Sequence, residues 1–171
     1  MQRRAFLVFA AFSASLAMAS LSGCGFALRK APNFAFTTLY SSLAESSPLG
    51  VQLRRSLEST GKVKVITDAR RVGEAQVVLD VLQDQREKVV LSLNSSGQVR
   101  EFQLRLRFSF RLRTLAGKEL IPATEIALQR DISFNESAVL AKEAEEALLY
   151  RDMQSDIVQQ IMRRLAAVKE I

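Results

Sequence analysis

The segment 98–114, QVREFQLRLRFSFRLRT, alternates apolar and polar side chains with a period of two residues. Such alternation over this length predicts a long β-strand that buries one face and leaves the other face in water. The buried face would carry the apolar side chains of Phe102, Leu104, Leu106, Phe108, Phe110 and Leu112. The other face would carry Arg, Gln and Ser, so we expect a sheet with one apolar side and one basic side.

A second long strand is predicted over 75–93, directly before the first one. The loop between them, Asn-Ser-Ser-Gly at 94–97, consists of turn formers and has the length of a hairpin loop. The simplest register of this hairpin sets Leu93 opposite Gln98. The sequence therefore predicts a long antiparallel hairpin.

This register predicts a structural role for two of the arginines. It sets Asp80 opposite Arg111 and Asp84 opposite Arg107. Cross-strand pairs of opposite charge each stabilise a sheet by roughly 0.2–1 kcal/mol. Pairing with these acids therefore accounts for Arg107 and Arg111.

The same register leaves other basic side chains without an acid opposite them. Arg86 would face Arg105, a like-charge contact that the fold alone does not favour, and Lys88 would face Gln103. We therefore expect Arg86, Lys88 and Arg105 to form a patch that binds a phosphate-bearing ligand or a partner, with Arg100 and Arg113 as weaker candidates. A strand face that is only solvated is the alternative.

Two helices are predicted outside the hairpin. Ser47 is a suitable N-cap, Pro48 is a suitable first helical residue, and Gly61 ends this helix. A long second helix covers about 138–168, with acidic residues near its start and basic residues near its end, as the helix dipole favours.

Shorter extended runs at 34–42, 62–68 and 124–135 contribute further strands. Amphipathic helices cover an apolar sheet face and leave the other face in water. We therefore predict an α+β fold, a two-layer sandwich in which two helices pack on one face of a mainly antiparallel sheet of about four strands.

The start of the chain predicts export and a lipid anchor. A basic Met-Gln-Arg-Arg precedes about 15 apolar or small residues and then Leu-Ser-Gly-Cys at 21–24. The apolar stretch is shorter than the roughly 20 residues of a transmembrane helix, and the arrangement is typical of a secretory signal peptide. Leu-Ser-Gly-Cys resembles the lipobox of bacterial lipoproteins, which implies cleavage before Cys24 and a diacylglycerol and an N-acyl chain on that residue.

We therefore divide the chain into a lipoprotein signal peptide (1–23), a lipidated tether (24–36) and a single domain (37–171). A plainly secreted protein with a stray cysteine is the alternative. The Arg-Arg pair near the N-terminus leaves the export route open between the general secretory route, which we favour, and the twin-arginine route.

Composition argues against several function classes. Without residues 1–23 the net charge falls from +6 to about +4, which is too little for a nucleic-acid-binding protein. The chain has no histidine, and Cys24 is its only cysteine, so neither a zinc site nor a cysteine or histidine catalyst is expected. It also lacks the glycine-rich nucleotide motifs. We expect a protein that is not an enzyme and needs no metal or dissociable cofactor.

Three stretches resemble one family. They are LSGCGFALR at 21–29, LNSSGQVREFQLRLRFSFRL at 93–112 and LAKEAEEALLYRDMQSDIVQQIMRRL at 140–165. In this order they resemble the N-terminal motif, the long hairpin and the C-terminal helix of the LPS-assembly lipoprotein LptE family. The resemblance covers nearly all of the chain after the signal peptide.

The resemblance implies an outer-membrane lipoprotein of Gram-negative bacteria that assists lipopolysaccharide transport and assembly at the cell surface. It also implies that the domain is a plug and assembly partner of the LptD barrel, within the barrel lumen or facing the periplasm. Arg86, Lys88, Arg105 and Arg100 would then bind phosphates of lipopolysaccharide, for which the guanidinium group of Arg is suited by its bidentate geometry.

Two other classes stay open. One is an accessory lipoprotein subunit of another envelope transport system, which would have the same anchor. The other is an envelope enzyme that works through carboxylates. Stable co-purification with a barrel protein would separate the first from the LptE interpretation, and turnover lost on single carboxylate changes would support the second.

We expect Cys24→Ala to leave the protein unprocessed or mislocalised, because the lipid on Cys24 is the expected anchor. Several acyl chains, each contributing about 0.8 kcal/mol per buried CH₂, give nearly permanent attachment. Membrane fractionation with a comparison of chain length measures both effects. A processed product that still fractionates normally with membranes would contradict the assignment.

Overall fold

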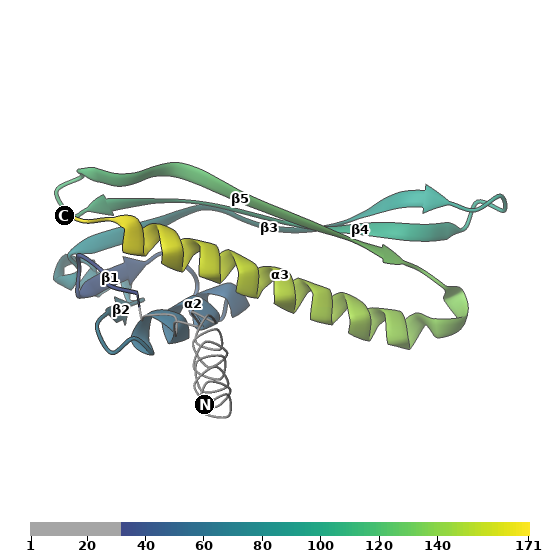
Figure 1. Ribbon diagram of the computed structural model, residues 1–171, viewed down its shortest axis with the longest axis horizontal. Helices are drawn as coiled ribbons and strands as arrows, with labels where there is room; N and C mark the ends of the chain where they lie inside the picture. The colour runs from purple at the N-terminus through teal and green to yellow at the C-terminus, as the bar shows by residue number, and fades with distance from the viewer. Residues whose placement is uncertain (1–31) are drawn as a thin grey trace, which may run out of the picture. The chain divides into compact units, whose positions relative to one another are not determined.

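A five-stranded sheet carries two helices on one of its faces in the computed structural model, which describes residues 32–171 (Figure 1). The strands are β1 (Thr38–Ser41), β2 (Lys64–Ile66), β3 (Val77–Leu93), β4 (Val99–Thr114) and β5 (Glu119–Ser133). The helices are α2 (Pro48–Glu58) and α3 (Val139–Ala167), with short 3₁₀ turns η2 (Ala69–Glu74) and η3 (Glu136–Ala138). The expected signal peptide, Cys24 and residues 24–31 of the tether lie outside the described residues.

The sheet order is β2-β1-β3-β4-β5, and the strands differ in direction. β3, β4 and β5 form an antiparallel ladder, whereas β1 is parallel to both β2 and β3. The predicted α+β class with helices on one face is confirmed, but the sheet has five strands rather than about four. The parallel part exists because α2 connects β1 to β2 and η2 connects β2 to β3, and each crossover returns the chain to the same end of the sheet.

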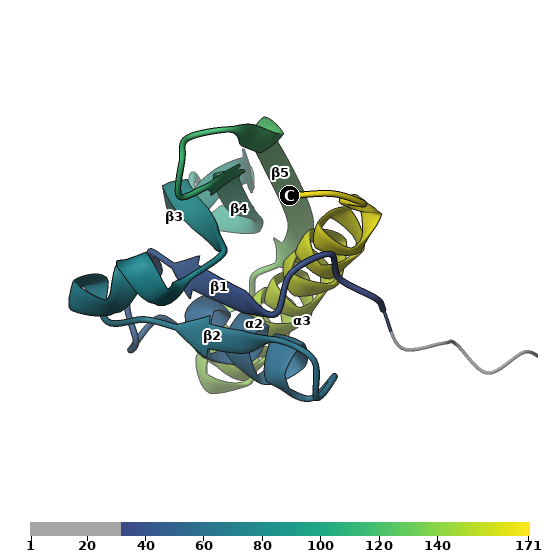
Figure 2. The ribbon, with the colours of Figure 1, turned by 90° about the vertical axis from the view of Figure 1, so that its left-hand side faces the viewer.

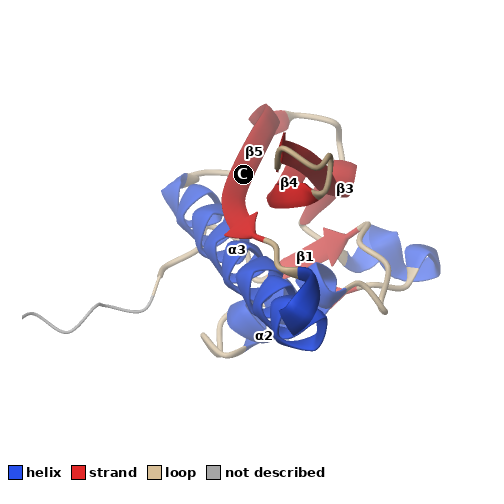
Figure 3. Ribbon diagram, turned by 90° about the vertical axis from the view of Figure 1, so that its right-hand side faces the viewer, coloured by secondary structure: helices blue, strands red, loops and turns tan. Residues whose placement is uncertain are grey.

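The core lies between the apolar face of β4 and the two helices, which Figure 3 shows together on one side of the strands. Phe102 on this strand face is partly buried, and the other five residues of its predicted apolar set have exposed fractions of 4% or less. α2 adds Leu49, Leu53 and Leu57, whose spacing of four residues places them on one side of the helix. α3 adds six buried side chains: Tyr150, Met153, Ile157, Val158, Ile161 and Leu165.

The described chain is held to this core from its first residues. Phe36 has an exposed fraction of 2%, and the centroid of its ring lies 5.6 Å from that of Phe34, which packs against the core. The last residues of the expected tether are therefore part of the packed body.

The predicted local signals at α2 and at the hairpin loop are confirmed. The Ser47 hydroxyl accepts a hydrogen bond from the Gly50 amide at 3.3 Å, and Pro48 is the first helical residue. Gly61 follows the helix with φ of +69°. Gly97 closes the hairpin with φ of +80°, a backbone conformation that residues with a Cβ rarely adopt.

The register of the hairpin is as predicted only near its open end. Asp80 pairs with Arg111, but a β-bulge at Leu82 inserts one residue into β3. Beyond the bulge the pairing moves by one residue, so Asp84 lies opposite Phe108 and not opposite Arg107. The prediction that Asp84 compensates Arg107 was therefore wrong.

The carboxylate of Asp80 connects two arginines of β4. It accepts hydrogen bonds from Nε of Arg111 at 2.9 Å and from Nε of Arg113 at 2.8 Å. The hydrogen bond from Arg113 is the main cause that holds the pKa of Asp80 below its usual value. Asp84 is the opposite case, because it has no ion pair among the described residues and loss of hydration raises its pKa.

We expect Asp80→Asn to lower the free energy of unfolding by about 1 kcal/mol at neutral pH, because two partly buried ion pairs are lost. A lowered pKa in the folded state means that Asp80 stabilises the fold above pH 4, its ordinary range, and that this contribution disappears as the pH falls through the lowered pKa. Urea unfolding of both proteins between about pH 7 and pH 2 measures the difference, which should vanish at the acid end.

The matched control is Asp84→Asn, which removes the same charge four residues further along β3. It should cause no loss of stability at neutral pH, since ionised Asp84 is held in a poorly hydrated position without a partner. A loss equal to that of Asp80→Asn would contradict the assignment of the stabilisation to the arginine pairs.

Candidate functional site

The bulge at Leu82 decides which way the candidate basic residues point. Arg86 lies opposite Leu106 and Lys88 lies opposite Leu104, so both belong to the helix-covered face of the sheet. Arg105 lies opposite Glu87 on the other face. The predicted like-charge contact between Arg86 and Arg105 was wrong, and the structure does not bring the candidate residues together in one patch.

On the helix-covered face, Arg86 and Lys88 contact α3. Nζ of Lys88 lies 2.7 Å from Oε2 of Glu146, and Nη2 of Arg86 lies 3.6 Å from the other carboxylate oxygen. The Arg86 guanidinium also stacks over the ring of Tyr150, 3.4 Å from its centroid, and the Tyr150 hydroxyl donates a 2.6 Å hydrogen bond to the Glu87 carbonyl. These contacts fasten the N-terminal half of α3 to the far half of β3.

Lys88 also lines a cleft between α3 and the far end of the sheet, which we call the distal cleft. Its volume is about 220 Å³, and its apolar lining comes from Phe102, Ile132, Phe134 and Val139. Its polar lining consists of Lys88, Lys142, Ser133, Glu143 and Glu146. The cleft therefore combines an apolar lining with two ammonium groups and two carboxylates.

The two lysines of the distal cleft are held in place by different partners. Nζ of Lys88 lies 4.2 Å from the centroid of the Phe102 ring as well as beside Glu146. Nζ of Lys142 contacts the Ser133 hydroxyl at 3.0 Å and Glu145 at 2.8 Å. Such a site can accept an amphiphile whose anionic group meets the lysines while its apolar part covers the aromatic side chains of the lining.

Two further candidate residues lie elsewhere. Nε of Arg105 donates to the side-chain oxygen of Gln103 at 2.6 Å, and that amide donates in turn to Asp131 at 2.9 Å, so Arg105 belongs to a polar network on the uncovered face. Arg100 is exposed near the hairpin loop, at a register shift where Ser92 pairs with Glu101 and Leu93 pairs with Val99.

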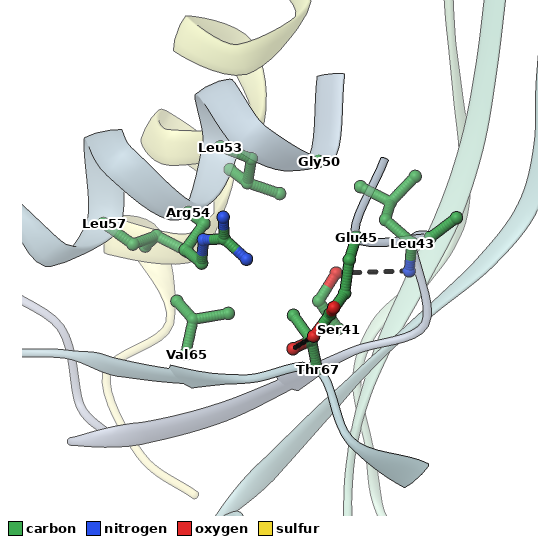
Figure 4. A pocket seen from close by; sticks show the side chains of 10 residues that line it. Ser41, Leu43, Glu45, Gly50, Leu53, Arg54, Leu57, Val65 and Thr67 are labelled. Atoms are coloured by element: carbon green, nitrogen blue, oxygen red, sulfur yellow. Dashed lines mark hydrogen bonds between the residues drawn. The ribbon is translucent and has the colours of Figure 1, made fainter. Parts of the chain in front are cut away.

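A second hollow, between α2 and the β1–β2 edge, is much smaller. Figure 4 shows Leu53, Arg54 and Val65 around it, with Thr67 beside Glu45, to which its hydroxyl donates at 2.6 Å. Its volume of about 10 Å³ is the space of one water molecule, so the distal cleft is the better candidate for a ligand site.

Among residues 32–171 no cluster of three His, Cys, Asp or Glu is placed to hold a metal ion.

Sequence reasoning missed Lys142, Glu146 and the cleft itself. Lys142 and Glu146 are four residues apart, so they occupy one side of α3, but charges at the start of a helix are usually solvated. The long C-terminal helix was predicted, yet nothing in its sequence indicated which sheet residues its first turns would meet. No helix of the described part of the chain has the length and hydropathy needed to cross a bilayer.

The fold is similar to that of solved lipoproteins. The solution structure of an uncharacterised lipoprotein B from Nitrosomonas europaea is 37% identical, with a TM-score of 0.69 over 84% of this chain and 91% of that one. The crystal structure of the rare lipoprotein B from Shewanella oneidensis is 27% identical, with a TM-score of 0.59 over 77% of this chain and 93% of that one. The fold therefore defines the class, an α+β domain of bacterial lipoproteins.

Sequence comparison narrows the class to a family. The family model LptE, described as lipopolysaccharide-assembly, matches residues 36–165. The LPS-assembly lipoprotein LptE of Pectobacterium atrosepticum is 28% identical over 156 residues, which are 90% of this chain and 82% of that protein. The chain belongs to the LptE family.

Proposed function

We propose that the chain is an outer-membrane lipoprotein that assists lipopolysaccharide transport and assembly as the plug and assembly partner of the LptD barrel. Membership of the LptE family carries this proposal. A barrel lumen is polar, and this body presents a polar face of strands together with exposed charged helix surface, as a plug requires. The role is that of an accessory protein and not of a catalyst. The anchor is the lipid on Cys24, and the domain lies within the lumen or faces the periplasm.

We further propose that the distal cleft contacts lipopolysaccharide. Its phosphates would meet Lys88 and Lys142, and an apolar part of the glycolipid would cover Phe102 and Phe134. Arg100 is a further phosphate contact near the hairpin loop. Arg86 contributes mainly by holding α3 against the sheet through Tyr150 and Glu146. If Arg105 also binds a phosphate of lipopolysaccharide, it does so on the uncovered face of the sheet and not in the distal cleft, so its role is a separate prediction.

Depletion of the protein tests the barrel partnership. We expect the amount of assembled barrel to fall and the cells to become more sensitive to detergent, because the plug assists assembly and the surface then carries less glycolipid. The protein should also co-purify with the barrel from membranes in equal amounts. Unchanged barrel levels and detergent resistance would contradict the proposal, and co-purification with another transport complex would favour the alternative subunit role.

The double variant Lys88→Gln/Lys142→Gln tests the distal cleft. We expect binding of purified lipopolysaccharide to weaken at least tenfold, since each charge-assisted contact contributes about 1.5–3 kcal/mol and 1.4 kcal/mol corresponds to a factor of ten. The binding constant should be measured at fixed salt, because exposed charges are screened.

Arg107→Gln/Arg151→Gln is the matched control, because both arginines are exposed and make no ion pair among the described residues. It removes the same charge and should bind like the parent. Equal weakening by both double variants would show that only net charge matters. Arg105→Gln, measured beside them, tests the uncovered face separately.

A further inference from the structure

The end of the body at which the tether joins differs in charge from the opposite end. β1, β2 and β3 all start at this end, and β4 finishes there, since Thr114 pairs with Val77 at the start of β3. Figure 2 looks onto this end, with η2 on the left, the β4–β5 turn at the top and the last turns of α3 on the right; the turn before β2 lies at the same end. We call these segments the basic end, and they cover 58–64, 68–74, 113–119 and 163–170.

Charge is distributed unevenly between the two ends. The four segments of the basic end hold nine Lys and Arg residues against five Asp and Glu residues. The far end, 86–105 and 130–146, holds six Lys and Arg against seven Asp and Glu. The positive charge of the described body is therefore concentrated where the tether joins it.

Much of this positive charge is not used by the fold. Arg71 pairs with Glu74 at 2.6 Å and Arg113 pairs with Asp80 at 2.8 Å. Lys64, Arg70 and Lys118 are exposed and make no ion pair among residues 32–171. Unpaired like charges gathered at one end repel one another and oppose folding slightly. A binding role explains their presence better than stability does.

The tether brings the same end close to the expected lipid. Nζ of Lys62 contacts the Asn33 side-chain oxygen at 3.0 Å, so the chain enters the body beside the basic end. Cys24 precedes Pro32 by only eight residues. An extended chain spans at most about 3.5 Å per residue, so a lipid on Cys24 would hold this end within about 30 Å of the membrane surface. This step rests on the proposed lipid attachment.

We propose that the basic end docks on the anionic phospholipid headgroups of the leaflet that holds the anchor. Each Lys or Arg near such a surface is attracted by about 1 kcal/mol, and the attraction falls off within a Debye length. The lipid attaches the protein and the charge orients it. Because the far end carries no positive excess, the basic end faces the leaflet and the hairpin loop points away from it.

The test uses residues 24–171 with Cys24→Ser, which carry every described helix and strand and no lipid. We expect this protein to sediment with vesicles of phosphatidylcholine containing phosphatidylglycerol, to stay in solution with phosphatidylcholine alone, and to be released by salt. Lys62→Glu/Lys64→Glu in this protein should reduce partitioning onto the anionic vesicles at least tenfold, since it removes two attractions and adds two repulsions.

Arg107→Glu/Arg151→Glu is the matched control, because it changes the net charge by the same amount away from the basic end. It should partition at least tenfold better than Lys62→Glu/Lys64→Glu. Equal losses in the two variants would overturn the localised docking surface. Failure of the parent to bind anionic vesicles would also overturn it. Neither result depends on Cys24, whose lipid is tested by fractionation.

Discussion

The packing of α3 against the apolar face of β4 is the interaction on which the rest of the fold depends. β4 lies between β3 and β5, so its backbone groups are hydrogen-bonded on both sides. Its alternating side chains make one face of the long antiparallel ladder apolar and the other face polar. Leu104, Phe108 and Phe110 are completely buried on one face. Because α3 runs along this strand as Figure 1 shows, it reaches the far end of the sheet, where β1 and β2 contribute nothing. The distal cleft exists only because of that reach.

The β-bulge at Leu82 then determines the chemistry of the far end. A single inserted residue turns the side chains of β3 from Gln83 to Val90 to the face opposite the one expected without it. Without it, Arg86 and Lys88 would share the uncovered face with Arg105. With it, they contact Glu146 and Tyr150 and couple the sheet to α3. Because of this bulge, Arg86 and Lys88 form ion pairs with α3 beside the distal cleft, where a regular strand would have left them solvated on the uncovered face.

The sequence predicts the parts of this structure that follow from local patterns, and it misses what depends on distant contacts. The alternation of β4, the cap of α2 by Ser47 and the turn at Gly97 are encoded over a few residues, and each is present. The bulge leaves no such trace, because Gln83 to Lys88 are all polar and fit either face equally well. The candidate patch failed for this reason, and the family resemblance could not correct it. Lys142 and Glu146 can be recognised as residues of the cleft only once the position of α3 on the sheet is known.

The charges of the distal cleft are balanced, which bears on how it would handle a glycolipid. Lys88 already has Glu146 at 2.7 Å, and Lys142 has Glu145 at 2.8 Å. A phosphate that binds there must compete with these carboxylates, so part of each new attraction replaces an existing one. Such competition lowers affinity while it keeps the lysines positioned when no ligand is present. Under the proposed function, a protein that assists transport has to release its cargo as well as bind it, and a cleft with internal counterions is suited to brief contact more than to tight capture.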